Sequence, residues 1–154
     1  MRKQLKEGLS VVVGVMVLLI FIAMIQLVRD TPKPVQNTIR VADQAYSVEI
    51  ADTPEERSRG LMGRLTLARN EGMLFIFEDS APRSFWNQDT LIPLDVIFID
   101  QGRVVAVEQL PKFDPAFGPI TVSSETPSQY VLELNQGSGV TIGDEATFQP
   151  LPGI

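Results

Sequence analysis

The chain has 154 residues, a formal net charge of −6, and neither histidine nor cysteine. Its acidic balance argues against nucleic acid as a partner, because phosphate binding needs a basic face. Without histidine and cysteine, triad hydrolysis, thiolate chemistry and the commonest zinc sites are disfavoured, and we expect no cofactor and no metal.

An apolar run over residues 9–28 follows a basic start over residues 1–8, and only Ser10, Gly14 and Gln26 interrupt it. At ~1.5 Å per residue it spans ~30 Å, the thickness of the hydrocarbon core of a bilayer. The run therefore predicts a single-pass transmembrane anchor in contact with the lipid bilayer. A cleaved secretory signal begins in the same way, but this run exceeds the usual ~7 to 15 apolar residues and no small-x-small cleavage site follows it.

Charge predicts the orientation of this anchor. Three basic residues precede the run and two follow it, a bias toward a cytoplasmic N-terminus. From residue 35 onward, eight Lys and Arg stand against seventeen Asp and Glu, which disfavours docking on an anionic cytoplasmic leaflet. We therefore expect a periplasmic or otherwise extracytoplasmic C-terminal domain.

Residues 29–37 form a spacer that contains Pro32 and Pro34. Each proline fixes its own φ and disfavours helix at the preceding residue, so the spacer is predicted to be short and stiff. About ten residues reach at most ~35 Å, which keeps any partner of the domain close to the membrane. Residues 38–150 are long enough for one domain with its own core, and residues 151–154 form a tail.

Short β-type segments separated by turn residues dominate the domain. One helix is expected, since Thr53 and Glu56 form a capping box with Pro54 at the first helical position; it should run to Leu61 or Met62 and end at Gly63. Prolines 111, 115 and 119 mark an extended loop. Strands are expected at Thr38–Val41, Tyr46–Ala51, Met73–Phe77, Ser84–Gln88, Asp95–Ile99, Arg103–Val107, Tyr130–Leu134, Val140–Ile142 and Ala146–Phe148.

The number of strands predicts a mainly β fold, an antiparallel β-sandwich or barrel of the jelly-roll kind with one short helix. The hairpin between Asp95–Ile99 and Arg103–Val107 is expected to turn through a three-residue loop, residues 100–102, with Gly102 in the left-handed conformation. In Tyr130–Leu134, alternation puts Tyr130, Leu132 and Leu134 on one face and Val131 and Glu133 on the other.

Several motifs in order resemble domain of unknown function family 192. They are EERSRGLMGR at residues 55–64, EGMLFIF at 71–77, FW at 85–86, TLIPLDVIFID at 90–100 and YVLEL at 130–134. The resemblance covers about residues 38–148. It implies a compact, mainly β domain, often secreted or membrane-anchored in bacteria and some archaea, and no established activity.

This chain departs from the family pattern after the FW motif. Asn87 and Asp89 stand where methionine and asparagine are usual, so an apolar position has become polar and an amide has become acidic. If buried, each change needs a hydrogen-bond partner or costs about 1 to 3 kcal/mol. A solvated face, or one against a partner protein, avoids that cost.

Candidate site residues are few. Asp89 and Asp95 flank the bend at Pro93 and would suit paired-carboxylate glycoside hydrolysis if close enough, although acidic residues beside turns are mostly solvated or capping groups. Trp86 is expected either in the core or as a stacking platform.

Arg57, Arg59, Arg64 and Arg69 form a local basic cluster. These residues suit an anionic ligand, with Arg64 as the residue of most interest. In the alternative, Arg59 pairs with Glu55 across one helical turn while Arg57 and Arg69 face water.

These observations leave two hypotheses. The first is a non-catalytic, membrane-anchored interaction module, an accessory or structural subunit that contacts another membrane or envelope protein. The alternative is a domain that binds a small ligand or glycan, with weak carboxylate-based hydrolysis as an extension. The candidate binding residues, with no catalytic residue assigned, are Arg59, Arg64, Trp86, Asn87, Asp89 and Asp95.

Overall fold

In the computed structural model, two units divide the chain, residues 1–35 and 36–154. The structure describes residue 16 and residues 37–149. The predicted anchor, apart from residue 16, lies outside the described residues, as do residues 29–36 of the spacer and the tail. Among the residues that are described, no helix is both long and apolar enough to cross a membrane.

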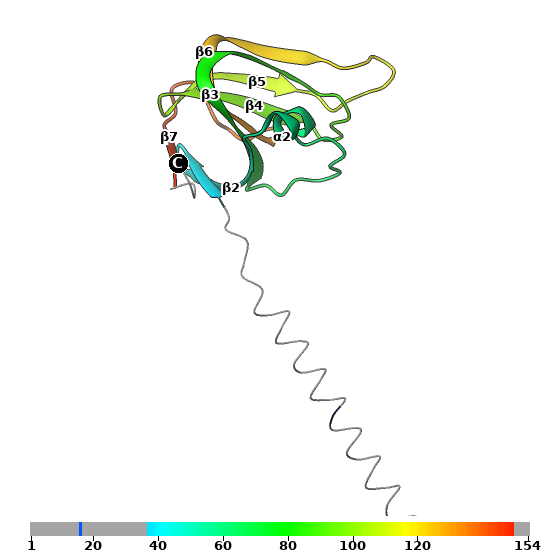
Figure 1. Ribbon diagram of the computed structural model, residues 1–154, viewed down its shortest axis with the longest axis horizontal. Coiled ribbons are helices and arrows are strands. Elements are labelled where there is room, and N and C mark those ends of the chain that lie inside the picture. The colour runs from blue at the N-terminus through cyan, green and yellow to red at the C-terminus, as the bar shows by residue number, and fades with distance from the viewer. Residues whose placement is uncertain (1–15, 17–36, 150–154) are drawn as a thin grey trace, which may run out of the picture. The chain divides into compact units, whose positions relative to one another are not determined.

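Residues 37–149 contain seven strands and one helix (Figure 1). The elements in chain order are β1 (Asn37–Val41), β2 (Gln44–Ala51), α2 (Pro54–Arg59), β3 (Glu71–Trp86), β4 (Leu94–Asp100), β5 (Arg103–Leu110), β6 (Thr121–Asn135) and β7 (Ala146–Phe148). The mainly β class and the single short helix are therefore confirmed for this part of the chain.

The strands form a single sheet in the order β5-β4-β6-β3-β2-β1-β7. The predicted all-antiparallel arrangement is wrong at one pair, because β2 and β3 run parallel, with Val48 opposite Gly72. Parallel neighbours need a crossover connection, and α2 with the loop after it supplies one. The strands share one hydrogen-bonded sheet, so the described residues do not form two stacked sheets.

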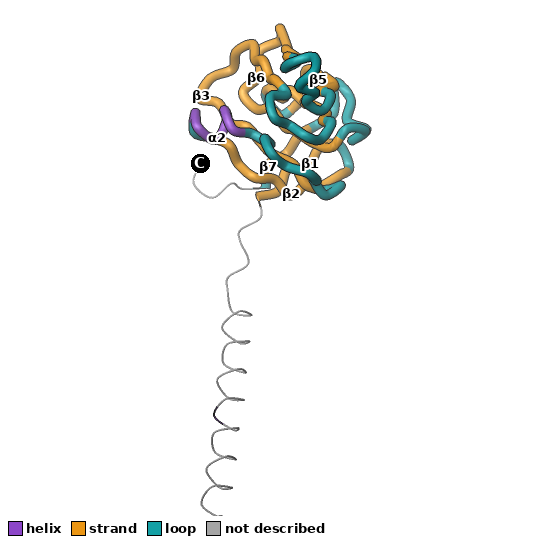
Figure 2. Tube along the Cα trace, turned by 90° about the vertical axis from the view of Figure 1, so that its right-hand side faces the viewer, coloured by secondary structure: helices purple, strands orange, loops and turns teal. Residues whose placement is uncertain are grey.

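The sheet curls until its two outer strands meet at one end. The Val104 N–H donates to Asp144 O at 2.9 Å, and the Ala146 N–H donates to Gly102 O at 2.8 Å. These bonds join the start of β5 to the chain that enters β7. The curvature of the sheet can be followed in Figure 2. The sheet thus has a concave and a convex face.

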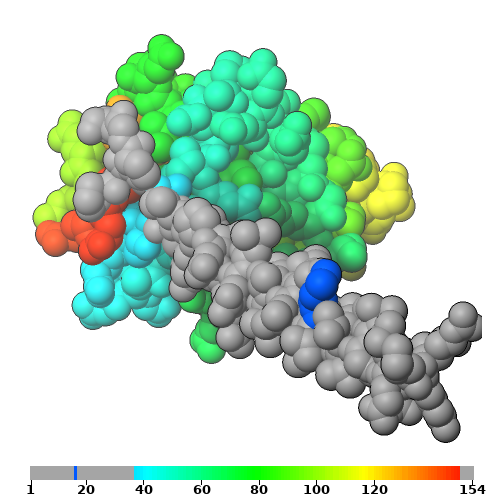
Figure 3. All heavy atoms as spheres, turned by 60° about the horizontal axis from the view of Figure 1, so that its bottom comes forward, coloured from blue at the N-terminus to red at the C-terminus, as the bar shows by residue number. Residues whose placement is uncertain are grey.

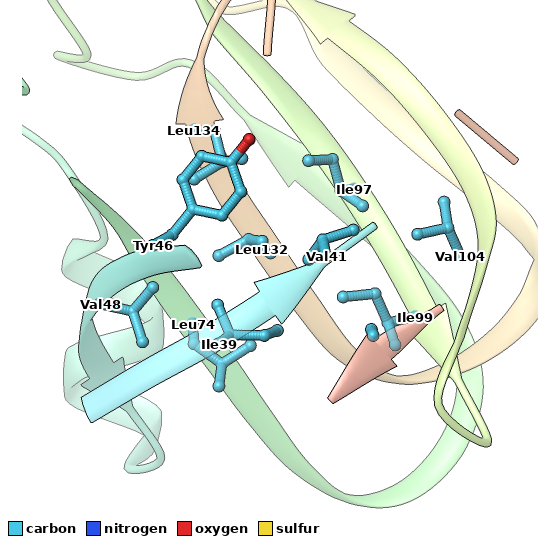
Figure 4. Close-up of a cluster of buried hydrophobic side chains, with 11 residues drawn as sticks. Ile39, Val41, Tyr46, Val48, Leu74, Ile97, Ile99, Val104, Leu132 and Leu134 are labelled. Carbon is cyan, nitrogen blue, oxygen red and sulfur yellow. The ribbon is translucent and has the colours of Figure 1, made fainter. Parts of the chain in front are cut away.

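Each face carries a separate apolar core. One core gathers Ile39, Val41, Tyr46, Val48, Leu74, Ile97, Ile99, Val104, Leu132, Leu134 and Ala146 (Figure 4). The other gathers Ala51, Leu61, Met73, Phe75, Ile92, Leu94, Val96, Phe98, Leu110 and Val131. Neighbours in sequence such as Leu74 and Phe75 enter different cores because side chains alternate along a strand. Strands β3, β4 and β6 are therefore apolar on both faces.

Several predicted segments change length. Met73–Phe77 and the first three residues of Ser84–Gln88 belong to one strand, β3, which ends at Trp86. This strand continues through register shifts between Ile76 and Arg83 in its pairing with β6. The hairpin of β4 and β5 turns through two residues, Gln101 and Gly102, both with positive φ, and not three. No strand forms at 140–142. The loop over residues 111–120 is confirmed as largely irregular.

Candidate functional site

Helix α2 begins at the capping box that the sequence predicts. Thr53 Oγ1 accepts the Glu56 N–H at 3.2 Å, and Glu56 Oε2 accepts the Thr53 N–H at 3.2 Å. The Thr53 N–H lowers the pKa of Glu56, because its hydrogen bond stabilises the carboxylate form. The helix ends at Arg59 and not at Leu61 or Met62, because Gly60 leaves helical geometry at φ 47° and ψ −135°.

A groove runs between α2 and β3, and we call it the α2–β3 groove. Its volume is about 530 Å³. Figure 3 shows, in teal, that α2 and the loop after it cover one face of the domain. The residues that line the groove are Pro54, Arg57, Ser58, Phe75, Phe77, Pro82, Arg83, Ser84, Phe85 and Trp86.

Two arginines of the groove share one aromatic ring. The guanidinium carbons of Arg57 and Arg83 lie 5.1 Å and 3.9 Å from the ring centre of Phe77. Arg57 Nη1 also donates to Ile76 O at 2.9 Å and to Asp52 O. Half-buried Arg57 therefore does not face water, as one interpretation of the sequence expected, but ties α2 to β3.

Arg83 is also engaged by its neighbours. Its Nη2 donates to Asp79 Oδ1 at 2.6 Å, and its Nε donates to Ser128 O at 3.3 Å. The ion pair lowers the pKa of Asp79. Both guanidinium groups are therefore engaged by the protein itself, and aromatic side chains contribute much of the lining of the groove.

A small cavity of about 20 Å³, room for one group of the size of a water molecule or an ammonium, adjoins the groove. The two spaces share Phe75, Phe85 and Trp86 as walls. Glu133 of β6 lines this cavity and is 4% exposed, and we call the space the Glu133 cavity. Burial in these apolar surroundings raises the pKa of Glu133 to about 8, because the charged form loses its hydration.

The structure brings two predicted site residues, Arg59 and Trp86, to the Glu133 cavity. Trp86 is 49% exposed, so it is a wall at the mouth and not a core residue. Arg64 instead forms an ion pair with Glu49 of β2, and Arg64 does not line either space.

Asn87 is fully buried, and both polar atoms of its side chain are bonded. Its Nδ2 donates to Pro111 O at 2.9 Å, and its Oδ1 accepts the Ile120 N–H at 2.7 Å. The polar side chain at position 87 therefore finds its hydrogen-bond partners at the two ends of the loop over residues 111–120. Asp89 is exposed, with φ 54°, and its carbonyl accepts the Gly63 N–H at 2.9 Å.

Asp95 is buried at the other face of the sheet, since it lies opposite Leu134, and Leu134 belongs to the core that Figure 4 shows. Its Oδ2 accepts the backbone N–H groups of Gly137 and Ser138 at 3.0 and 2.8 Å and the Ser138 hydroxyl at 2.8 Å. These contacts give Asp95 a structural role. Asp89 is not among the hydrogen-bond partners of the Asp95 side chain.

Within residues 37–149, no three acidic side chains gather where a metal ion could be held.

The prediction missed Glu133 as a site residue, together with the aromatic walls Phe75 and Phe85. Alternation marked Glu133 as facing away from Leu132 and Leu134, which is the usual pattern of a solvated carboxylate. The signal that could have found it is Val131, an apolar neighbour on the same face of the strand.

Comparisons with known proteins agree with this fold. The family model of DUF192, described as "Uncharacterized ACR", matches residues 35–148. A candidate transcription regulator from Sinorhizobium meliloti 1021 is 31% identical, with a TM-score of 0.65 over 73% of this chain and 93% of that one. A protein of unknown function from Novosphingobium aromaticivorans DSM 12444 is 29% identical, with a TM-score of 0.65 over 75% of this chain and 89% of that one. No curated protein matches.

Proposed function

Because the description of the DUF192 family, to which this chain belongs, names no activity, we propose the function from the geometry of the groove. The chain is a non-catalytic, membrane-anchored interaction module that binds an extended segment of an envelope protein. The segment lies along the edge of β3 in the α2–β3 groove. The observation that carries this proposal is the unpaired edge of β3 beside an aromatic groove.

Strand β3 is sixteen residues long, but its neighbour β2 covers only its start. The parallel pairing of β2 with β3 runs from Glu71 to Phe75 and stops there. On the other side, β6 pairs with β3 as far as Trp86. Beyond Phe75, no strand within residues 37–149 pairs with this side of β3, where Ile76 O accepts Arg57 Nη1. From Arg83 to Trp86 the pairing with β6 is regular, so the backbone groups that point away from β6 face the open side, which is the geometry of β-augmentation.

The lining of the groove agrees with this geometry. All five consecutive residues from Pro82 to Trp86 border it. Side chains of a strand alternate between faces, so five consecutive residues border one space only when the backbone edge itself faces that space. Pro82 fits such an edge, since proline is confined to the edges of sheets. An added strand would find its backbone partners here and pockets for alternate side chains beside Phe77 and Phe85.

The membrane part of the proposal rests on the apolar run at residues 9–28. A tether of that kind holds the groove within the reach of the spacer, ~35 Å. A bound segment would then belong to another protein at the same membrane, and local concentration would compensate for a modest affinity. The N-terminus would lie in the cytoplasm and the groove in the periplasm or its equivalent.

A photoreactive amino acid in place of Ser84, inside the groove, tests the interaction in intact cells. The matched control places it at Gln109, which is exposed on β5 at another edge. We expect an adduct with one envelope protein from position 84 alone, with the cross-link on an extended segment identified by mass spectrometry. No adduct from position 84, or the same adducts from both positions, would overturn the proposal.

Alkaline extraction of membranes tests the anchor separately. The full chain should stay with the membrane pellet, and a chain without residues 9–28 should be released. Recovery of the full chain in the alkaline supernatant would contradict a transmembrane anchor and leave the groove proposal standing.

A further inference from the structure

Glu133 is a buried carboxyl group without a partner. It is 4% exposed, and no hydrogen bond or ion pair of its carboxylate is found within residues 37–149. Its cross-strand neighbours on the same face are Met73 of β3 and Val96 of β4, both buried and apolar. A carboxylate in such a place costs several kcal/mol unless a cation or a donor reaches it.

Aromatic rings surround the space in front of this carboxyl group. Phe75, Phe85 and Trp86 line it, and the rings of Phe75 and Phe85 meet edge to face, with centroids 4.8 Å apart and planes at 85°. Thr90 and Ser58 add hydroxyl groups. Aromatic faces carry negative electrostatic potential, so rings that surround a carboxylate favour a cation of the size of an ammonium group.

The arginines nearby do not supply that cation. Arg57 lines the cavity, but its guanidinium group is held by Ile76 O, Asp52 O and the Phe77 ring, and Arg83 is held by Asp79. Arg59 lines the cavity, but its residue is exposed at the end of α2. The side chains of β4 and β6 that lie next to Glu133 carry no charge. The carboxyl group therefore meets no bound counter-charge.

We propose that the Glu133 cavity binds an alkylammonium group, the side-chain head of a lysine on the segment that lies along β3. This inference rests on the proposed function, since the cavity adjoins the α2–β3 groove and shares walls with it. The methylene stem of the lysine contacts Trp86 and Phe85 at the mouth, and the ammonium pairs with Glu133. A long apolar stem with a charged head suits this path.

Binding of this kind releases a proton. Free Glu133 is largely protonated at neutral pH because burial raises its pKa to about 8, whereas the ammonium pairs with the carboxylate. The affinity for a lysine segment should therefore rise as the pH increases from about 6 to about 8.5. A ligand that accepts a hydrogen bond from the protonated acid would show the opposite trend.

The test uses the full chain in detergent micelles and isothermal titration calorimetry. The probes are an acetylated, amidated Val-Thr-Lys-Thr-Val peptide, its norleucine analogue and n-butylammonium. We expect the lysine peptide to bind wild type about tenfold tighter than the norleucine analogue near pH 8.5, with proton release detected as a dependence on buffer ionisation enthalpy. Glu133→Gln should abolish the difference, and Glu125→Gln, an exposed glutamate of the same strand, should preserve it.

Trp86→Leu provides a second variant if Glu133→Gln does not fold, and it should also reduce the lysine preference. Equal binding of the two peptides to wild type would overturn the ammonium site and leave the β3 edge supported. Binding of n-butylammonium that depends on Glu133, without binding of either peptide, would support the cavity and overturn the β3 edge. Binding of none of the three probes would overturn both.

Discussion

The carboxylate of Glu133 lies beneath Gly60, so that a Cβ at Gly60 would stand 3.9 Å from Glu133 Oε2. Gly60 has φ 47°, a conformation that favours glycine. Its N–H donates to Glu56 O at 2.8 Å and closes the last turn of α2. The end of one helix therefore helps to bury a carboxyl group on a distant strand.

Glu133→Gln should change how stability depends on pH. The pKa of Glu133 rises from 4.5 in the unfolded chain to about 8 in the folded protein. Between these values the folded state holds a proton that the unfolded state has lost, so the free energy of unfolding falls as the pH rises, and the full penalty is present above about pH 8. Glutamine removes this dependence.

Urea denaturation at about pH 5 and about pH 9 measures the effect. Wild type and Glu133→Gln should have similar stability at the lower pH, and the variant should be more stable by about 2 kcal/mol or more at the higher pH. Parallel pH profiles of the two proteins would show that Glu133 is not buried as an unpaired acid.

Asn87→Ala should destabilise the domain by about 2 to 4 kcal/mol, because Pro111 O and the Ile120 N–H both lose a buried partner. The free energy of unfolding in urea reports the loss. Gln88→Ala, next to it and only half-buried, should stay within about 0.5 kcal/mol of wild type. Equal effects at the two positions would contradict the anchoring role of Asn87.

Asp95→Ala should cost about 1.5 to 3 kcal/mol, since a carboxylate that accepts three hydrogen bonds from residues 137 and 138 is lost. Asp89→Asn, a conservative change at an exposed side chain, should be nearly neutral. Thermal unfolding of both variants separates the two carboxylates. A hydrolytic activity lost equally in both variants, with stability unchanged, would instead favour the paired-carboxylate hypothesis.

Arg57→Ala should lower stability by about 1 to 2 kcal/mol, because α2 loses its bond to Ile76 O and the contact with Phe77. Arg57→Lys should recover only part of this, since an ammonium is not planar and cannot donate in the same fork. The control is Arg59→Ala, at an exposed position two residues along the same helix. Chemical denaturation of the three variants gives the comparison, and full rescue by lysine would show that charge alone matters.

Local signals in the sequence predicted much of the fold. The capping box at Thr53 and the apolar segment Met73–Phe77 both form as expected. The parallel pair could not be predicted in the same way, because it depends on how the crossover through α2 returns the chain beside β2. The continuation of β3 through Pro82 was also missed, since proline signals a break unless the strand is known to lie at an edge.

The site was harder to predict than the fold. Trp86 and Arg59 were identified from residue type and local clustering, and both line the Glu133 cavity. Glu133 was not, because its burial comes from Gly60 and Phe75, which approach it from other elements. Alternation along a strand shows which face a residue takes but not what covers that face.

Hydrogen–deuterium exchange of the full chain, with and without the Val-Thr-Lys-Thr-Val peptide, tests the central claim most directly. Protection against exchange reports new backbone hydrogen bonds segment by segment. The account predicts added protection over residues 76–86 and none over the β5 edge, residues 103–110. Protection over β5 alone, or binding without protection of residues 76–86, would contradict a partner strand along β3.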